Sequence, residues 1–344
     1  MSKKPTIKTI AQIAGVSHVT VSRALRGYSD ISKATTQKIQ QIAKDIGYTP
    51  NAFARSLSSK QSNILGMIVP ALGNDTAYND VFNAVSACAA REGLSVLLGS
   101  CNRNLSLEMN YCKNMCENRV GALIISPITS DVSHIKEICK DIVPVIFLGG
   151  KTGLEEDYCI TIDYQNSAKI AVSHLYHLGH RDIALFLYSP NNKTIEQKMI
   201  GYEEAMNAYQ LPTRIYWEGD SSDTLKAGTK LTERLILENN LPSAIWCASD
   251  LMAVGVINAL SKYNLKVPSD VSVIGHDNLF FSDLNFISLT TFTLPKQEIG
   301  KKAVEMALEL MHYNKDNNEP KPYCKSIFQA ELLQRNSTGI WDKH

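Results

Sequence analysis

From residue 64 onward, short runs of apolar and often β-branched residues alternate with longer stretches whose apolar residues recur every three or four positions. The short runs are typical of strands buried on both faces, and the longer stretches are typical of amphipathic helices. This alternation predicts parallel sheets that helices cover on both sides. There are too many strands for one such sheet, so we expect two similar doubly wound lobes. The predicted strands cover residues 64–69, 95–98, 122–125, 145–148, 183–187, 244–247 and 271–274, and the predicted helices cover 79–91, 105–118, 165–178, 197–209, 225–238 and 251–263.

The first sixty residues have a different pattern, which predicts three short helices around one small core. Residues 6–14 place four apolar side chains on one helical face, and the sequence Gly15-Val16-Ser17 breaks that helix. A second helix follows at 18–25. Ser32 caps a third helix that Gly47 ends, as expected for the residue after a helix.

The spacing in the first two helices is typical of a helix-turn-helix. Ala11, Gly15 and Val21 provide a small residue at the helix crossing, a residue that tolerates the turn, and an apolar residue that locks the second helix. The second helix of such a motif lies in the major groove with its N-terminal residues nearest the bases. We therefore expect DNA contacts from these side chains of the head: Thr6, Ser17, His18, Val19, Ser22, Arg23 and Ser32.

Individual roles follow from side-chain chemistry. Arg23 can bond guanine through two donors, Val19 can contact a thymine methyl group, and the hydroxyls suit phosphates. The alternative is that Ser17 only caps its helix and that Arg23 is a solvated surface charge.

The charge distribution favours the DNA-binding interpretation. Residues 1–62 hold ten Lys and Arg against Asp30 and Asp45, a net charge of +8, whereas the remaining 25 basic and 32 acidic residues give −7. A basic head on an acidic body indicates a polyanionic partner for the head alone.

Long stretches of the chain resemble the lactose/galactose-repressor (LacI/GalR) family of bacterial transcription regulators. TIKTIAQIAGVSHVTVSRAL (6–25) and IGYTPNAFARSL (46–57) are similar to the head and hinge of that family. The similarity continues through TIDYQNSA (161–168), LGHRDIAL (178–185), ASDLMAVG (248–255), VPSDVSVIGHDN (267–278) and LTT (289–291).

The resemblance implies an all-α helix-turn-helix head and an α/β body of two doubly wound parallel-sheet lobes, like a periplasmic binding protein. We expect the head over residues 1–50, a hinge helix and linker over 51–61, and an effector-binding and dimerisation domain over 62–340. The first lobe is expected at about 62–161 and 293–321, and the second at about 162–292 and 322–340.

The hinge is expected to touch the minor groove. The segment 51–58 is too short to be a stable helix alone, and the resemblance implies that it folds only when two copies meet on DNA. Leu57 would then wedge between base steps and bend the duplex. Asn51 would cap this helix, and Ala54 and Arg55 would lie along the groove.

The effector site is expected where the strands of both lobes end, because ligands of such sheets sit beyond the carboxyl ends of the strands. The residues that follow the apolar runs are Ala71, Ser126, Gly149, Ser249 and Asp277. We expect Asp277 to be the main effector contact, since a carboxylate can accept hydrogen bonds from two neighbouring hydroxyls. Asp250, which follows Ser249, is expected to cap the helix that begins at Leu251.

Other effector contacts follow from the resemblance and from departures within it. Tyr78 is a further expected effector contact. Lys198 stands where the family usually has Arg, and Ser221 stands where an aromatic residue commonly stacks on the ligand. Lys198 could bind an anionic group or could be a plain surface lysine. The effector is thus expected to be a small polar molecule such as a sugar, sugar acid or sugar phosphate.

No cofactor or metal site is expected. His174, His177 and His180 have helical spacing, but Gly179 interrupts the helix, so surface and capping roles are favoured. Cys112 and Cys116 share a helix face without a second thiol pair and are expected to pack.

The favoured function is a non-enzymatic regulator, by family default a repressor, that binds a pseudo-palindromic operator as a homodimer or a tetramer. A transporter's solute-binding protein would need an export signal and would lack residues 1–60. A sugar-modifying enzyme is the second alternative, although no G-x-S-x-G or HExxH motif occurs. We expect a cytoplasmic, nucleoid-associated protein without membrane contact.

Overall fold

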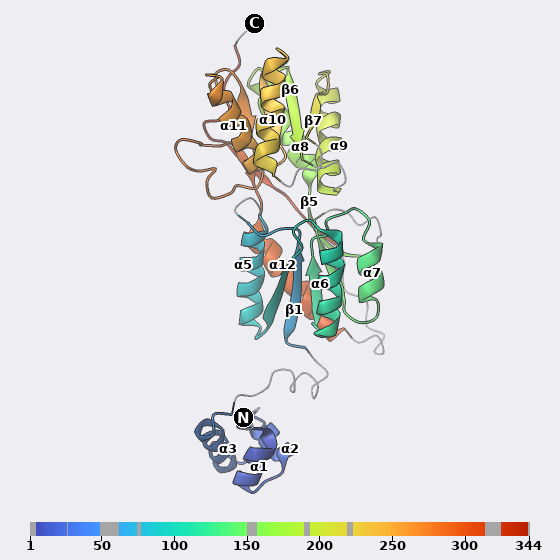
Figure 1. The fold of residues 1–344 in the computed structure, drawn as a ribbon, viewed down its shortest axis with the longest axis vertical. Coiled ribbons are helices and arrows are strands. Elements are labelled where there is room, and N and C mark those ends of the chain that lie inside the picture. The colour runs from blue at the N-terminus through green and yellow to red at the C-terminus, as the bar shows by residue number, and fades with distance from the viewer. Residues whose placement is uncertain are drawn as a thin grey trace. The chain divides into compact units, whose positions relative to one another are not determined.

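A computed structural model describes residues 5–25, 27–48, 62–73, 77–149, 157–188, 193–218, 223–313 and 325–342. The chain forms two compact units, Met1–Gln61 and Ser62–His344 (Figure 1). We call the first unit the head and the second unit the body. No helix of the described residues is long and apolar enough to cross a membrane.

The described part of the head consists of three helices, α1 (Ile7–Ala14), α2 (His18–Leu25) and α3 (Lys33–Asp45). Thr6 caps α1 in a reciprocal pair with Thr9, and Gly15 ends that helix with a φ of 71°. A positive φ is readily available to glycine, which allows the sharp turn into α2. Ile10, Val21, Ala24 and Ile39 are fully buried in the core that the three helices share.

The first lobe of the body is built on a six-stranded parallel sheet in the order β11-β5-β4-β3-β1-β2. Alternate residues of β1 face opposite layers: Met67 packs in the cluster with Val85 of α5, and Ile68 packs with Met115 of α6. The helices therefore cover both faces of the sheet, as a buried parallel sheet requires. The strands are β1 (Ile64–Val69), β2 (Ser95–Ser100), β3 (Ala122–Ile125), β4 (Val145–Leu148), β5 (Tyr158–Ile162) and β11 (Lys325–Phe328), and the helices are α5 (Tyr78–Arg91), α6 (Leu105–Glu117), α7 (Ser133–Cys139) and α12 (Lys296–His312).

The second lobe has a four-stranded parallel sheet in the order β7-β6-β8-β9, with α8 against α9 and α10 against α11 (Figure 1). A short antiparallel pair, β10 (Thr291–Thr293) with β12 (Glu331–Leu333), lies where the chain passes between the lobes. The strands are β6 (Ile183–Leu187), β7 (Ile215–Trp217), β8 (Ala244–Cys247) and β9 (Ser272–Ile274), and the helices are α8 (Tyr164–His177), α9 (Lys193–Ala208), α10 (Thr224–Leu237) and α11 (Asp250–Lys262).

One expected lobe boundary is wrong. Residues 322–340 were assigned to the second lobe, but β11 pairs with β5 from Lys325↔Cys159 to Phe328↔Ile162, inside the first sheet. The strand is at the edge of the sheet and is only partly buried, so its sequence lacks the apolar run that marks a central strand. The chain therefore enters the second lobe after Phe328.

Candidate DNA-binding and effector sites

The N-terminal part of α2 carries exposed apolar and polar side chains. Val19 is 53% exposed, and His18 beside it is also exposed. Ser17 Oγ accepts a hydrogen bond from the backbone N–H of Thr20 at 3.0 Å, so its side chain serves as the cap of α2. The helix thus presents a side chain that can contact a methyl group, on a helix start that is already fixed.

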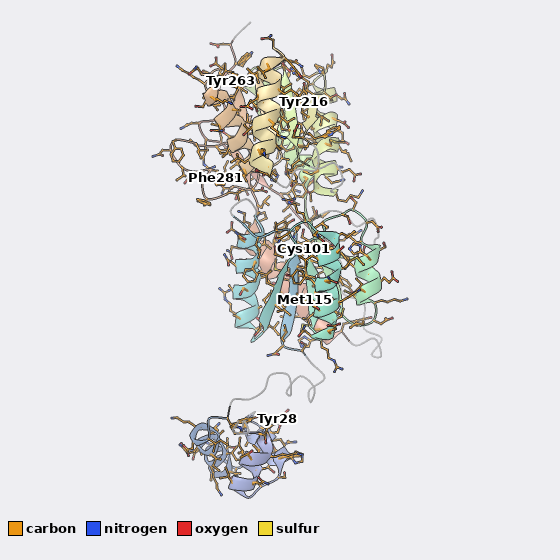
Figure 2. The ribbon with its side chains drawn as sticks, in the orientation of Figure 1. Tyr28, Cys101, Met115, Tyr216, Tyr263 and Phe281 are labelled. Atoms are coloured by element: carbon orange, nitrogen blue, oxygen red, sulfur yellow. The ribbon has the colours of Figure 1, made fainter. Side chains whose placement is uncertain are left out.

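Arg23 lies on the same helix but has partners within the head. Its guanidinium is 2.7 Å from the Asp30 carboxylate and lies 4.8 Å from the ring centre of Tyr28, which Figure 2 labels. Arg23 and Asp30 are each about half exposed. An exposed pair of this kind contributes only about 0.2 to 1 kcal/mol, so a guanine can replace Asp30 as the partner of Arg23.

The remaining hydroxyls of the head differ in position. Thr6 and Ser32 cap α1 and α3, which places them at helix N-termini, where backbone N–H groups favour anions. Ser22 is half-buried on α2. The four hinge candidates, Asn51, Ala54, Arg55 and Leu57, lie outside the described residues.

In the body, several of the effector candidates come together between the lobes. From the first lobe, the Tyr78 hydroxyl is 2.7 Å from Ser126 Oγ. Burial raises the pKa of Tyr78, and the Asp277 carboxylate of the second lobe raises it further. Residues from both lobes therefore share one electrostatic environment.

Lys198, at the second-lobe side of this cluster, is a buried cation. It is only 3% exposed, which rules out the interpretation as a plain surface lysine. Its Nζ donates to the carbonyl oxygen of Ala248 at 2.7 Å and lies 5.2 Å from the ring centre of Tyr164. Burial lowers its pKa from 10.5 to about 8, although Asp277 and Asp250 act in the opposite direction. None of the described carboxylates forms an ion pair with it, so the charge is only partly compensated.

Two carboxylates face this lysine. Burial raises the pKa of Asp277 to about 6, against the positive charges of Lys198 and Lys296. Burial also raises the pKa of Asp250 to about 7, and Asp277 adds to that rise. The side chain of Asp277 is 19% exposed and lies 3.3 Å from Nδ1 of the neutral, buried His276. The Nε2 atom of His276 is buried and has no hydrogen-bond partner among the described residues.

Asp250 does not have its expected role. The cap of α11 is Ser249, whose Oγ accepts a hydrogen bond from the Met252 N–H, and Asp250 is the first residue of the helix. The fully buried Asp250 carboxylate instead accepts hydrogen bonds from the Leu279 N–H and the Thr291 hydroxyl. It therefore holds the turn that carries Asp277.

Three effector candidates remain, namely Gly149, Ala71 and Ser221. Gly149 directly follows β4, and a Cβ there would lie 3.5 Å from Thr194 of the second lobe, so this position faces across the lobes. Ala71 is half-buried just after β1. Ser221 lies outside the described residues.

The sequence did not single out several residues of this cluster. Arg103 of the first lobe lies 5.6 Å from the ring centre of Tyr188 in the second lobe, and Lys296 donates to Asp80 at 2.7 Å. Tyr164 shares the environment of Tyr78, Asp277 and Tyr188. Tyr164, Tyr188 and His276 all follow closely on the carboxyl end of a strand. The rule that ligands sit beyond strand ends would have found Tyr164 if β5 had been among the predicted strands. It would have found Tyr188 and His276 if every residue just after β6 and β9 had been taken as a candidate.

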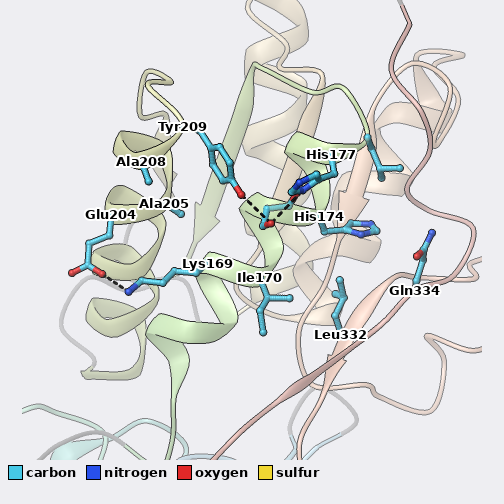
Figure 3. A pocket seen from close by; sticks show the side chains of 12 residues that line it. Lys169, Ile170, His174, His177, Glu204, Ala205, Ala208, Tyr209, Leu332 and Gln334 are labelled. Carbon is cyan, nitrogen blue, oxygen red and sulfur yellow. Dashed lines mark hydrogen bonds and ion pairs between the residues drawn. The ribbon is translucent and has the colours of Figure 1, made fainter.

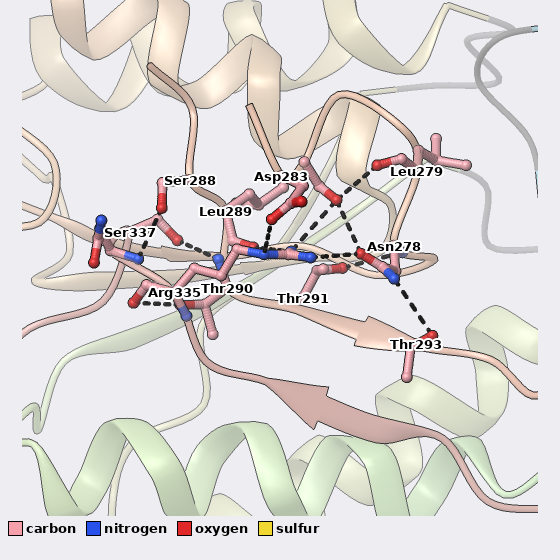
Figure 4. A network of polar contacts seen from close by, with 12 residues as sticks. Asn278, Leu279, Asp283, Ser288, Leu289, Thr290, Thr291, Thr293, Arg335 and Ser337 are labelled. Atoms are coloured by element: carbon pink, nitrogen blue, oxygen red, sulfur yellow. Dashed lines mark hydrogen bonds and ion pairs between the residues drawn. The ribbon is translucent and has the colours of Figure 1, made fainter. Parts of the chain in front are cut away.

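A polar network anchors the turn around Asp277 to the C-terminal segment (Figure 4). Arg335 donates to the Leu289 carbonyl at 2.7 Å and to Asn278 Oδ1 at 2.9 Å, and its Nε lies 3.1 Å from Asp283. Asp277 itself has a φ of 115°, which an L-residue adopts only where its surroundings enforce it. The network is thus part of what positions the effector carboxylate.

No group of three or more metal-ligand side chains with suitable geometry occurs in the described parts of the chain. His180 is not a surface residue: it is fully buried and lies 2.9 Å from both Ser243 Oγ and Ser272 Oγ. Cys116 Sγ is 3.9 Å from Cys139 Sγ in the core between α6 and α7, consistent with packing.

Comparisons with known proteins agree with this architecture. Residues 6–51 match the model of bacterial regulatory proteins of the lacI family, and residues 172–338 match a periplasmic binding protein-like domain. Catabolite control protein A of Priestia megaterium is 31% identical over 314 residues, covering 90% of this chain and 93% of that protein. The transcriptional repressor PurR of Vibrio parahaemolyticus is 28% identical, covering 96% of this chain and 98% of that protein. A lac repressor dimer bound to operator and an anti-inducer superimposes with a TM-score of 0.85 at 26% identity, over 98% of this chain and all of that one.

Proposed function

Because this chain belongs to the LacI family of bacterial regulatory proteins, we propose that it is a transcriptional repressor whose affinity for a pseudo-palindromic operator depends on a small polar effector. It works by binding and not by catalysis. The observation that carries this proposal is the combination of a basic three-helix head with an exposed α2 and a body whose lobes enclose a buried polar cluster.

The head reads one half of the operator. With α2 in the major groove, Val19 contacts a thymine methyl group and Arg23 exchanges Asp30 for a guanine. The capping hydroxyls Thr6 and Ser32 lie where the phosphate backbone passes helix N-termini. Leu57 of the hinge inserts into the minor groove at the centre of the site.

Two copies of the chain bind the two half-sites. In the second lobe, Phe280 is 73% exposed and Phe286 is 81% exposed in the segment between β9 and β10. Exposed aromatic side chains that occur in one short segment are typical of an interface. We assign this surface to the homodimer. A regulator that binds the chromosome acts in the cytoplasm, on the nucleoid.

The effector carries an anionic group together with hydroxyls. Lys198 is a buried cation that forms no ion pair with a described carboxylate, and a ligand carboxylate or phosphate would compensate its charge. Asp277 accepts hydrogen bonds from the effector hydroxyls. This combination favours a sugar acid or a sugar phosphate over an uncharged sugar.

Effector binding controls the head through the lobes. Because Tyr78 and Ser126 belong to the first lobe while Lys198 and Asp277 belong to the second, a bound effector favours one lobe arrangement over others. Such coupling is typically about 1 to 3 kcal/mol, and operator DNA must change effector affinity by the same factor.

The test is fluorescence anisotropy with an operator selected from random duplexes, measured against a scrambled duplex over a range of salt concentrations. We expect a selected site to bind at least about 1,000-fold more tightly than the scrambled one. Equal binding to both duplexes at every salt concentration would refute sequence-specific regulation. Thermal-shift measurements with glucuronate, glucose 6-phosphate and glucose then test the effector class, and a response to glucose alone would refute the anionic group.

A further inference from the structure

A cavity lies on the second lobe, and none of its lining residues belongs to the cluster between the lobes (Figure 3). Its volume is about 900 Å³, and it lies between α8, α9 and the segment that contains β12. We call it the α8–α9 groove. Its apolar lining includes Ile170, Ala205, Ala208, Tyr209 and Leu332.

The polar groups of the groove largely satisfy one another. The Tyr209 hydroxyl donates to Ser173 Oγ at 3.0 Å, and His174 Nε2 lies 3.0 Å from the Thr338 hydroxyl. Lys169 and Glu204 form an ion pair at 2.8 Å, so the two charges cancel. Burial lowers the pKa of His174, which keeps that ring neutral near pH 7. Lys169, Glu204 and His174 therefore leave no uncompensated charge in the groove, and the other histidine of the lining, His177, lies with Nδ1 2.7 Å from the Ser173 carbonyl oxygen.

An exposed amide at the rim is available to a ligand. Gln334 is exposed at the rim, and its amide makes no hydrogen bond with any of the described residues. An amide offers both donors and an acceptor. Concave, mostly apolar sites of about 300 to 1,000 Å³ with few polar groups are typical of small-molecule sites. We propose that the α8–α9 groove binds a second small molecule, an uncharged ring compound with one hydrogen-bonding group, and that its binding changes operator affinity.

Strand β12 connects the groove to Asp277 and His276, which belong to the cluster between the lobes. Leu332, in its wall, is paired in register with Phe292 of β10. The Phe292 carbonyl accepts a hydrogen bond from the Asp277 N–H at 3.0 Å, and its ring stacks on His276 at 5.3 Å. A ligand that shifts Leu332 therefore acts on the strand that supports the main effector carboxylate.

The two helices provide a second connection. Tyr164 and Lys198, which belong to the cluster between the lobes, lie on α8 and α9. Later turns of the same two helices line the groove. At Gly201 the helices are so close that a Cβ would overlap the Gln165 carbonyl oxygen. Helices locked this tightly move together and not independently, so occupancy of the groove is transmitted to the cluster between the lobes.

The experiment uses the full-length dimer and indole as the probe, with binding measured by saturation-transfer NMR and calorimetry. Ala208→Trp fills the groove from an exposed position, and Asn207→Trp places the same ring on the neighbouring exposed residue, which does not line the groove. We expect Ala208→Trp to weaken indole binding about tenfold or more, and we expect Asn207→Trp to leave it unchanged. Indole-3-acetate should bind more weakly than indole, because Lys169, the lysine of the groove, is already paired with Glu204.

Several results would overturn the proposal. Absence of indole binding, or equal binding by Ala208→Trp, would remove the site. Tighter binding of indole-3-acetate than of indole would contradict the uncharged class. Saturating indole should change the operator Kd about fivefold or more in the wild type and in Asn207→Trp but not in Ala208→Trp, and an unchanged Kd in the wild type would refute the coupling. Operator binding without indole serves as the reference, so failure of this proposal is separate from failure of the regulator assignment.

Discussion

Replacing Lys198 with Met should stabilise the effector-free body and weaken its effector response. Burial lowers the pKa of Lys198 from 10.5 to about 8. At pH 7 the amine is protonated in both folded and unfolded chains, so the folded protein bears the full penalty. That pKa difference corresponds to about 3 kcal/mol.

The expected gain for Lys198→Met at pH 7 is about 1 to 3 kcal/mol in the free energy of unfolding. Met fills a similar volume without a charge, but the hydrogen bond to the Ala248 carbonyl is lost and Asp277 loses a nearby cation. Above a pH of about 8 the wild-type amine begins to lose its proton in the folded state, and above 10.5 it is neutral in both states. The stability difference between the Lys198→Met variant and the wild type should therefore shrink as the pH rises between these two values.

Chemical denaturation followed by tryptophan fluorescence measures this difference, because Trp246 is fully buried in the second lobe. Lys262→Met is the matched control: Lys262 is 66% exposed beside Glu233, so its replacement should change stability by less than about 1 kcal/mol. A Lys198→Met variant that is less stable than the wild type at pH 7 would show that the lysine charge is already well compensated. That result, or a difference that does not shrink with rising pH, would refute the reasoning.

Further predictions concern DNA, pH, assembly and packing. Arg23→Ala should weaken selected-operator binding by about 1 to 3 kcal/mol while leaving effector binding intact, and unchanged anisotropy titrations would remove Arg23 from base recognition. Effector affinity, measured by calorimetry, should be highest between about pH 6 and pH 8, since Asp277 takes up a proton below its pKa of about 6 and Lys198 loses one above about 8; a flat profile would exclude both groups. Phe286→Asp should raise the dimer dissociation constant at least about tenfold in analytical ultracentrifugation, because it places a charge in an apolar interface; an unchanged constant would place the dimer surface elsewhere. Gly255→Ala should lower the free energy of unfolding by about 1 to 3 kcal/mol, because the new Cβ would overlap the Leu225 carbonyl oxygen and push α10 from α11; wild-type stability in the same denaturation assay would contradict this packing.

The local patterns were sufficient to predict most of the architecture. Strands such as β1 and β6 have uninterrupted apolar runs because both of their faces are buried, so their sequences identify them. The three head helices carry their own caps and a compact core, which are determined by residues close together in the chain. Strand ends alone predicted Ser126 and Asp277 as site residues, because parallel strands bring their carboxyl ends to one edge.

Only the tertiary structure decided what depends on contacts distant in sequence. The edge strand β11 could be assigned to the first sheet only through its pairing with β5, since an edge strand needs no continuous apolar run. Ser249, and not Asp250, caps α11, because the buried Asp250 carboxylate bonds Leu279 and Thr291, and no local pattern contains that information. The same holds for Lys198: its residue type suggested either a surface charge or a ligand contact, and its burial beneath Ala248 and Tyr164 decided against the surface. Capping and periodicity act over one or two helical turns, whereas desolvation and charge depend on every element that packs around a group.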